Sequence, residues 1–202
     1  MTEQRRPLLL TAAALAVFVA LLVLVAVDSP VTSLDQHVYD GLLRRPHRPL
    51  LDQAKHLTDV LSPLVDVLVL GAGAAAVTWR RRELGPLVAT GIAGWFMVLV
   101  VVVVKHAVGR PNPSPVPATH GGSFPSGHTA AALVCFGALA LLLALERPRW
   151  LAPMLGSAAV ITALLAGALV YSGYHWLSDT VASIALGVGV LVPLHHWLRR
   201  RA

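Results

Sequence analysis

Residues 120–145 read HGGSFPSGHTAAALVCFGALALLLAL, a polar turn that runs directly into an apolar stretch of membrane length. A helix needs about 20 apolar residues to cross the hydrocarbon core of a bilayer. The sequence predicts six such spans, at about 8–27, 60–79, 85–104, 128–145, 151–172 and 180–198. We therefore expect an all-α polytopic membrane protein, a six-transmembrane-helix bundle that forms one membrane-embedded domain over residues 1–202.

Composition supports a membrane setting. The 202 residues are 56% hydrophobic and 13% charged, whereas soluble domains carry about 25% charged residues. The net charge of +6 would suit a nucleic-acid partner, but in so apolar a chain membrane topology explains the arginines better. No nucleic-acid partner is therefore expected. The first apolar run is longer than the core of a signal peptide, which favours a retained anchor.

The distribution of Lys and Arg predicts the orientation of the bundle. With six spans, both termini share one side with the second–third and fourth–fifth connections. That side holds ten of the sixteen basic residues: Arg5, Arg6, Arg80, Arg81, Arg82, Arg147, Arg149, Arg199, Arg200 and Arg201. The other side holds Arg44, Arg45, Arg48, Lys55, Lys105 and Arg110. Because basic residues favour the cytoplasmic side, we expect cytoplasmic termini in a cell membrane.

The connection over residues 28–59 is expected to contain short helices. Thr32-Ser33-Leu34-Asp35 is typical of a helix cap, and Val38 and Leu42 follow Leu34 at helical spacing. A second short pattern follows Pro46. Amphipathic pieces lying in the membrane interface fit this pattern. An ordered outer loop packed on the bundle fits it equally well, and the two are compatible.

The turn Pro125-Ser126-Gly127-His128 has the composition of an anion site. A helix N-terminus presents unpaired N–H groups, which attract phosphate. Ser126 adds a hydroxyl, Gly127 allows close backbone approach, and His128 is able to protonate a leaving oxygen. The alternative is structural, with Ser126 only capping the helix and His128 reaching to the membrane interface.

His175 and Asp179 are four residues apart and so share one face of a helix. The carboxylate would fix the imidazole tautomer and leave the other ring nitrogen free to attack a substrate. Two alternatives remain open. The pair could belong to a metal site with His106, His120 and His128, although metals need about three or four ligands. It could also be an interfacial His bonded to a helix-capping Asp.

Three further charged residues lie near the predicted span ends. Lys105 closes the third span, where it could bind substrate or only reach toward the interface. Arg110 follows close to the same surface. Asp66 lies about six residues into the second span, where a charge is costly; it is either a functional acid or a shallow helix-start residue.

Together these residues resemble the type 2 phosphatidic acid phosphatases, lipid phosphate phosphatases related to vanadium haloperoxidases. That family carries Lys, six residues, Arg-Pro; then Pro-Ser-Gly-His; then Ser-Arg, five residues, His, three residues, Asp. The second signature is complete here at residues 125–128, and the third keeps its His175 and Asp179. The first keeps Lys105 and Pro113. The resemblance extends over nearly the whole chain.

Both signature arginines are replaced. Asn112 stands at the position of the first, and Leu169, preceded by Ala168, stands at the position of the second. Arginine makes bidentate, permanently charged contacts to phosphate that Asn and Leu do not reproduce. Arg110, or Arg48 with its neighbours Arg44 and Arg45, is a candidate substitute.

The resemblance implies a metal-independent hydrolase for phosphoric monoesters or diphosphates of lipids, without a cofactor. It implies attack by His175 to form a phosphohistidine, with Asp179 as its partner and His128 as the acid. Lys105, Ser126, Gly127 and Arg110 would bind the substrate, from an outward-facing site. Outer-leaflet lipids such as undecaprenyl diphosphate or phosphatidylglycerol phosphate are the expected substrates.

Two alternatives remain because of the missing arginines. One is a divergent member that acts as a phosphotransferase or on a less charged phosphoester. The other is a non-catalytic lipid-binding or lipid-transport protein. The sequence does not address the oligomeric state.

Overall fold

The protein, in a computed structural model that describes residues 2–27, 29–43, 47–114 and 121–201, is an all-helical bundle. Its long helices are α1 (Thr2–Ala26), α4 (Pro63–Arg81), α5 (Gly85–Val108), α6 (Gly127–Glu146), α7 (Leu151–Ser172) and α8 (Leu177–Arg201). The short helices are α2 (Pro30–Leu43), α3 (Leu51–Val60) and the 3-10 turn η1 (Pro148–Trp150). Six helices are long and apolar enough to cross a membrane, which confirms the expected architecture.

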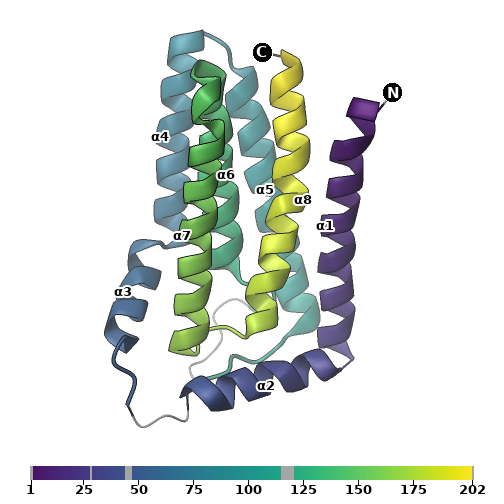
Figure 1. The fold of residues 1–202 in the computed structure, drawn as a ribbon, viewed down its shortest axis with the longest axis vertical. Helices are drawn as coiled ribbons and strands as arrows, with labels where there is room; N and C mark the ends of the chain where they lie inside the picture. The colour runs from purple at the N-terminus through teal and green to yellow at the C-terminus, as the bar shows by residue number, and fades with distance from the viewer. Residues whose placement is uncertain (1, 28, 44–46, 115–120, 202) are drawn as a thin grey trace.

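Helix α6 forms the centre of the bundle and packs against α4, α5, α7 and α8 (Figure 1). Most of its residues are buried because alanine and glycine let neighbouring helices approach closely. At Gly137 an added Cβ would lie only 2.4 Å from the side chain of Leu191 on α8. A larger residue there would force the Leu191 side chain to move. The most peripheral long helix, α1, packs mainly on α8.

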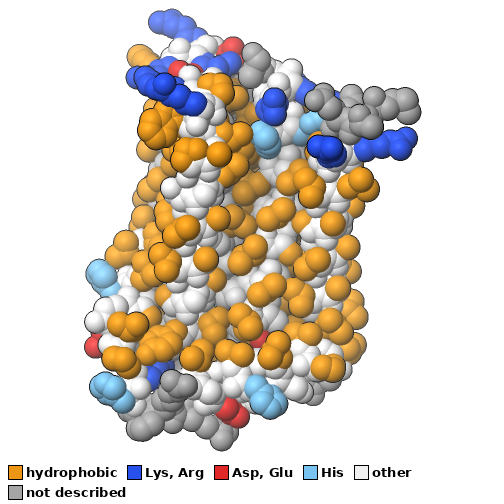
Figure 2. All heavy atoms as spheres, viewed as in Figure 1, with side chains coloured by type: hydrophobic (Ala, Val, Ile, Leu, Met, Phe, Trp, Pro, Cys, Tyr) orange, Lys and Arg blue, Asp and Glu red, His pale blue; other side chains and the backbone are white. Residues whose placement is uncertain are grey.

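The two ends of the bundle differ in charge. Both termini, the α4–α5 connection and η1 lie at one end, while α2 and α3 lie at the other (Figure 1). On the face drawn in Figure 2, Lys and Arg gather mainly at the end with the termini, and hydrophobic side chains cover the middle. This arrangement matches the grouping of loops on which the predicted orientation depends.

Helix α2 begins earlier than the sequence indicated. The expected cap at residues 32–35 was wrong, because the helix starts at Pro30, directly after Ser29. Ser29 Oγ accepts the N–H of Val31 at 3.2 Å, and proline suits the first turn, where its missing N–H has no partner to lose. As a result Asp35 lies inside the helix and is almost fully buried, at 2% exposure.

Asp66 is completely buried in the first turn of α4, and neither carboxylate oxygen has a hydrogen-bond partner in the described structure. An unpaired buried carboxylate is destabilising. We therefore expect Asp66→Ala to raise the melting temperature in detergent by a few degrees, since about 1 kcal/mol shifts Tm by 2–4 °C at this size. The control is Asp52→Ala, which removes an exposed acid from the first turn of α3. A lower Tm for Asp66→Ala than for this control would contradict the expectation.

Candidate active site

A cavity of about 550 Å³ lies where α3, α4, α5 and α6 meet the loops before α6 and α8. Four of the predicted site residues line it: Lys105, Gly127, His128 and His175. They come from three segments that are far apart in the sequence. The structure therefore brings the two histidines and the lysine to one cavity.

The Pro125–His128 turn forms the start of α6. Ser126 is the N-cap, with its Oγ accepting the Thr129 N–H at 3.4 Å and the Thr129 hydroxyl at 3.1 Å. Ser126 is fully buried and does not line the cavity. The capping alternative is therefore an observed role of Ser126, while Gly127 exposes the start of the helix to the cavity.

Lys105 is held against the turn that precedes α6. Its Nζ donates to the carbonyl oxygens of Gly122 at 2.6 Å and Ser123 at 3.4 Å. Gly122 lets this turn pack closely on the backbone at the end of α5, because a Cβ there would lie 3.0 Å from the backbone oxygen of Lys105 and the backbone nitrogen of Arg110. The ammonium group is thus fixed at the cavity wall.

His175 and Asp179 form the expected pair. His175 Nδ1 lies 3.2 Å from Asp179 Oδ2, and that oxygen also accepts the backbone N–H of Trp176 at 3.0 Å. Asp179 is fully buried and lies in the first turn of α8. It therefore acts as both the helix cap and the imidazole partner, and it leaves Nε2 of His175 outside this hydrogen bond.

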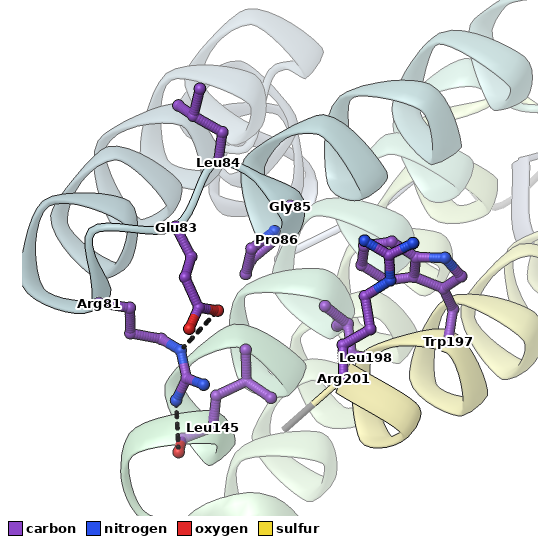
Figure 3. Close-up of a pocket in the computed structure, with 9 residues that line it drawn as sticks. All are labelled: Arg81, Glu83, Leu84, Gly85, Pro86, Leu145, Trp197, Leu198 and Arg201. Carbon is purple, nitrogen blue, oxygen red and sulfur yellow. Dashed lines mark hydrogen bonds and ion pairs between the residues drawn. The ribbon is translucent and has the colours of Figure 1, made fainter.

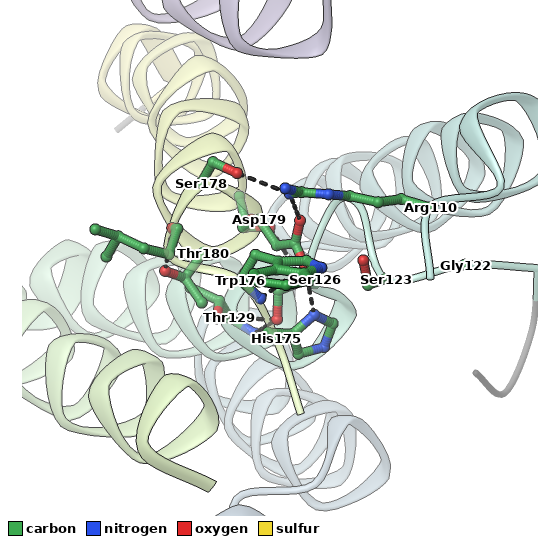
Figure 4. Close-up of polar contacts among 12 residues, drawn as sticks. Arg110, Gly122, Ser123, Ser126, Thr129, His175, Trp176, Ser178, Asp179 and Thr180 are labelled. Carbon is green, nitrogen blue, oxygen red and sulfur yellow. Dashed lines mark hydrogen bonds and ion pairs between the residues drawn. The ribbon is translucent and has the colours of Figure 1, made fainter. Parts of the chain in front are cut away.

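Arg110 lies on the other side of Asp179 from His175 (Figure 4), and it does not line the cavity. Its Nη1 donates to Asp179 Oδ1 at 2.7 Å and to Ser178 Oγ at 2.8 Å, and its Nη2 donates to Asp35 Oδ2 at 2.7 Å. The guanidinium carbon also lies 5.1 Å from the centre of the Trp176 ring. The charge of Arg110 is therefore shared between two carboxylates.

The two positions where the family signatures have arginine face the cavity. Asn112 and Leu169, the positions given by the spacing of the signatures, both line it. Arg48 does not line the cavity; it donates to the carbonyl of Tyr171 and lies over that ring. Arg44 and Arg45 lie outside the described residues. Among the described residues, no arginine lines this cavity.

Sequence reasoning missed Asp35 as a site residue. Asp35 shares one face of α2 with Val31, Val38 and Leu42, at spacings of about one helical turn. An acid within an otherwise apolar face is the signal that would have identified it. Such a residue needs a buried partner, and the structure supplies Arg110 and Ser178.

Other features do not form a competing site. Within the described part of the chain, no group of three His, Cys, Asp or Glu side chains is placed to hold a metal ion. His106 is exposed and bonds to its own helix at Val102, and His120 lies outside the described residues. A second cavity, of about 530 Å³, lies at the opposite end (Figure 3). Its lining includes Arg81, Glu83 and Trp197 but none of the predicted site residues.

Comparisons with known proteins identify the fold and the family. The fold is similar to that of a transmembrane PAP2-type phosphatidylglycerolphosphate phosphatase from Bacillus subtilis, with a TM-score of 0.80 and 21% identity over 94% of this chain and 97% of that chain. No curated protein matches the chain in sequence. The family model of the PAP2 superfamily matches residues 82–202, which include the cavity residues from Lys105 to His175. The chain belongs to the PAP2 superfamily.

Proposed function

We propose that this protein is an integral-membrane phosphatase that hydrolyses a lipid phosphate or polyprenyl diphosphate at the outer face of the cell membrane. The observation that carries the proposal is the convergence of His175, His128 and Lys105 on one cavity. A histidine nucleophile, a second histidine as acid and a cation for the phosphoryl oxygens are the groups that phosphoryl transfer requires.

The reaction would proceed in two steps without a metal ion. His175 Nε2 attacks the terminal phosphorus, the bond to the leaving oxygen of the lipid (or of the lipid phosphate, for a diphosphate) breaks, and His128 donates a proton to that oxygen. Water then attacks the phosphohistidine, His128 accepts a proton from the water, and inorganic phosphate leaves. Asp179 would hold Nδ1–H throughout, because its Oδ2 lies 3.2 Å from that nitrogen.

The backbone at the start of α6 and the ammonium of Lys105 would bind the phosphoryl oxygens. An ideal Cβ on Gly127 would lie 4.0 Å from Lys105 Cε, so the two groups border the same small space. Helix N-termini bind anions through unpaired N–H groups. Ser126 would support this site from behind, since its hydroxyl already serves Thr129.

The remaining cavity wall favours a lipid. It is lined by apolar residues of α4 and α5, among them Val67, Val98 and Val102. These three side chains are also exposed, so the hydrocarbon of a bilayer would be able to reach them. A substrate with an apolar tail would therefore reach the histidines while its tail stays in a similar environment.

The test is phosphate release by the purified protein in detergent. The panel contains phosphatidic acid, phosphatidylglycerol phosphate and undecaprenyl diphosphate, with a soluble phosphomonoester for comparison. Release from at least one lipid, faster than from the soluble ester, is expected. No release from any lipid would refute a lipid phosphatase.

A second candidate function follows from Asn112 and Leu169 at the cavity wall. Without arginine at these positions, the site is less suited to a dianionic phosphate and better suited to a less charged phosphoester. Adding a primary alcohol to the same assay separates the two reactions. Transfer of the phosphoryl group to the alcohol in preference to water would identify a phosphotransferase.

The proposed orientation predicts which introduced cysteines react from outside the cell. The natural Cys135 is buried, at 2% exposure, and should not interfere. We expect His47→Cys, in the α2–α3 connection, to be labelled by a membrane-impermeant maleimide in intact cells. Arg200→Cys, near the C-terminus, should be labelled only after the membrane is opened. The reverse pattern would place the candidate active site on the cytoplasmic side.

A further inference from the structure

A chain of three charged side chains runs from α2 to the histidine of the candidate site. Asp35 Oδ2 accepts from Arg110 Nη2 at 2.7 Å, and Arg110 Nη1 donates to Asp179 Oδ1 at 2.7 Å. The other oxygen of Asp179 lies 3.2 Å from His175 Nδ1. The contacts are continuous and connect four side chains in series.

The chain is shielded from solvent and supported at its centre. The side chains of Asp35 and Asp179 are 1% and 0% exposed, and that of Arg110 is 10% exposed. Ser178 donates its backbone N–H to Asp35 Oδ1 at 2.9 Å and its hydroxyl to Asp35 Oδ2 at 2.5 Å. Buried, charge-assisted contacts of this kind are strong and directional. Removing one partner leaves the others unpaired, which is costly.

The charges in this chain do not cancel. One guanidinium lies between two carboxylates, so the three groups together keep one negative charge next to His175. Without the carboxylate of Asp35, the positive charge of Arg110 would cancel the negative charge of Asp179, and the group would be neutral. An imidazolium or a phosphohistidine at His175 would then lose the negative charge that stabilises it.

The same contacts argue against Arg110 as a phosphate ligand. Both terminal nitrogens of its guanidinium are bonded to protein groups, and Arg110 is absent from the cavity lining. To pair with phosphate, Arg110 would have to break its contacts with both carboxylates. A role behind His175 therefore fits its position better than a role as phosphate ligand.

We infer that Asp35 is a positioning residue that holds Arg110 against Asp179, so that Asp179 stays oriented toward His175 and the three groups keep one negative charge beside it. This inference rests on the proposed phosphatase function and adds to it a helix outside the six spans. It also extends the site beyond residues 82–202, the part of the chain that the family model covers.

The test is the steady-state kinetics of Asp35→Asn, which keeps the shape of the side chain and removes its charge. We expect kcat to fall about 10–100-fold, by analogy with the loss found when a residue that orients a metal-binding histidine from outside the ligand set is removed. KM should stay within about twofold, because Asp35 does not contact the cavity. The matched control is Asp40→Asn on the same helix, where Asp40 accepts from Gln36; it should keep the kcat of the unaltered protein.

A double variant shows whether Asp35 acts through Arg110. In an Arg110→Gln background, Asp35→Asn should lower kcat no further, whereas an equal loss in both backgrounds would overturn the inference. If Asp35→Asn is not recovered folded, Arg110→Lys tests the same link, since an ammonium does not span two carboxylates in this geometry. A fall in kcat at constant KM is expected, and a raised KM at constant kcat would overturn the inference by assigning Arg110 to the substrate.

These outcomes separate the inference from the proposed function. If the unaltered protein releases phosphate and Asp35→Asn matches Asp40→Asn, the positioning role of Asp35 is wrong and the phosphatase function stands. If the unaltered protein releases no phosphate from any lipid, the proposed function fails and the positioning role fails with it.

Discussion

Replacing His175 with alanine is expected to abolish phosphate release, with a loss in kcat on the order of 10⁴-fold or more, the scale found when a catalytic nucleophile is removed. His175 lines the cavity with its Nδ1 bonded to Asp179, so Nε2 is the ring nitrogen available for attack. Alanine offers no atom that can form the phosphoryl intermediate. The measurement is phosphate release in detergent from the best lipid of the panel.

The control for this variant is His37→Ala. His37 is exposed on α2, and its Nδ1 bonds to the Ser33 carbonyl of the same helix at 2.7 Å. Its removal should leave kcat unchanged. Melting temperatures of both variants would show that each is folded. If His175→Ala retained more than about a tenth of the phosphate release of the unaltered protein, His175 would not be the nucleophile.

The fold was predictable from the sequence because the membrane imposes a simple rule on it. A helix must satisfy its own backbone hydrogen bonds inside a bilayer, so six apolar runs of sufficient length can only become six spanning helices. The predicted boundaries at Gly85 and Ser172 agree with the observed helices. Near Pro30 the prediction failed, because the cap depends on local hydrogen bonds that several neighbouring residues could have supplied.

The candidate site was only partly predictable. The positions of His128 and His175 follow from motifs that lie at the ends of spans on the same side. The partner of Arg110 depends on how α2 packs against the start of α8, and no motif connects Asp35 with residues 143 positions later in the chain. Such long-range pairing is decided by tertiary packing. For that reason Arg110 was assigned to the substrate from the sequence, whereas the structure places it behind Asp179.

The second large effect is expected from restoring an arginine to the cavity. Asn112 lies at the cavity wall in the loop between α5 and α6, a position that tolerates a longer side chain better than a helix interior does. We expect Asn112→Arg to raise kcat/KM for a dianionic lipid phosphate by about 100-fold, because a charge-assisted contact that strengthens in the transition state contributes about 3 kcal/mol, and each 1.4 kcal/mol is about tenfold in rate. Leu169 is 1% exposed, so Leu169→Arg would add a similar contact at a greater loss of stability.

Two comparisons establish whether the gain comes from the cavity. His47→Arg adds the same charge to an exposed position of the α2–α3 connection and should leave kcat/KM near that of the unaltered protein. A gain shared by both variants would mean that the added charge only attracts anionic substrates to this end of the bundle. Asn112→Gln lengthens the side chain without a charge and should also give no gain.

If Asn112→Arg lowered kcat/KM for every lipid phosphate and raised it for none, the cavity would not bind a dianionic phosphate at this wall. A less charged phosphoester would then be the better assignment for the substrate, since a cavity without both signature arginines suits a substrate of lower charge.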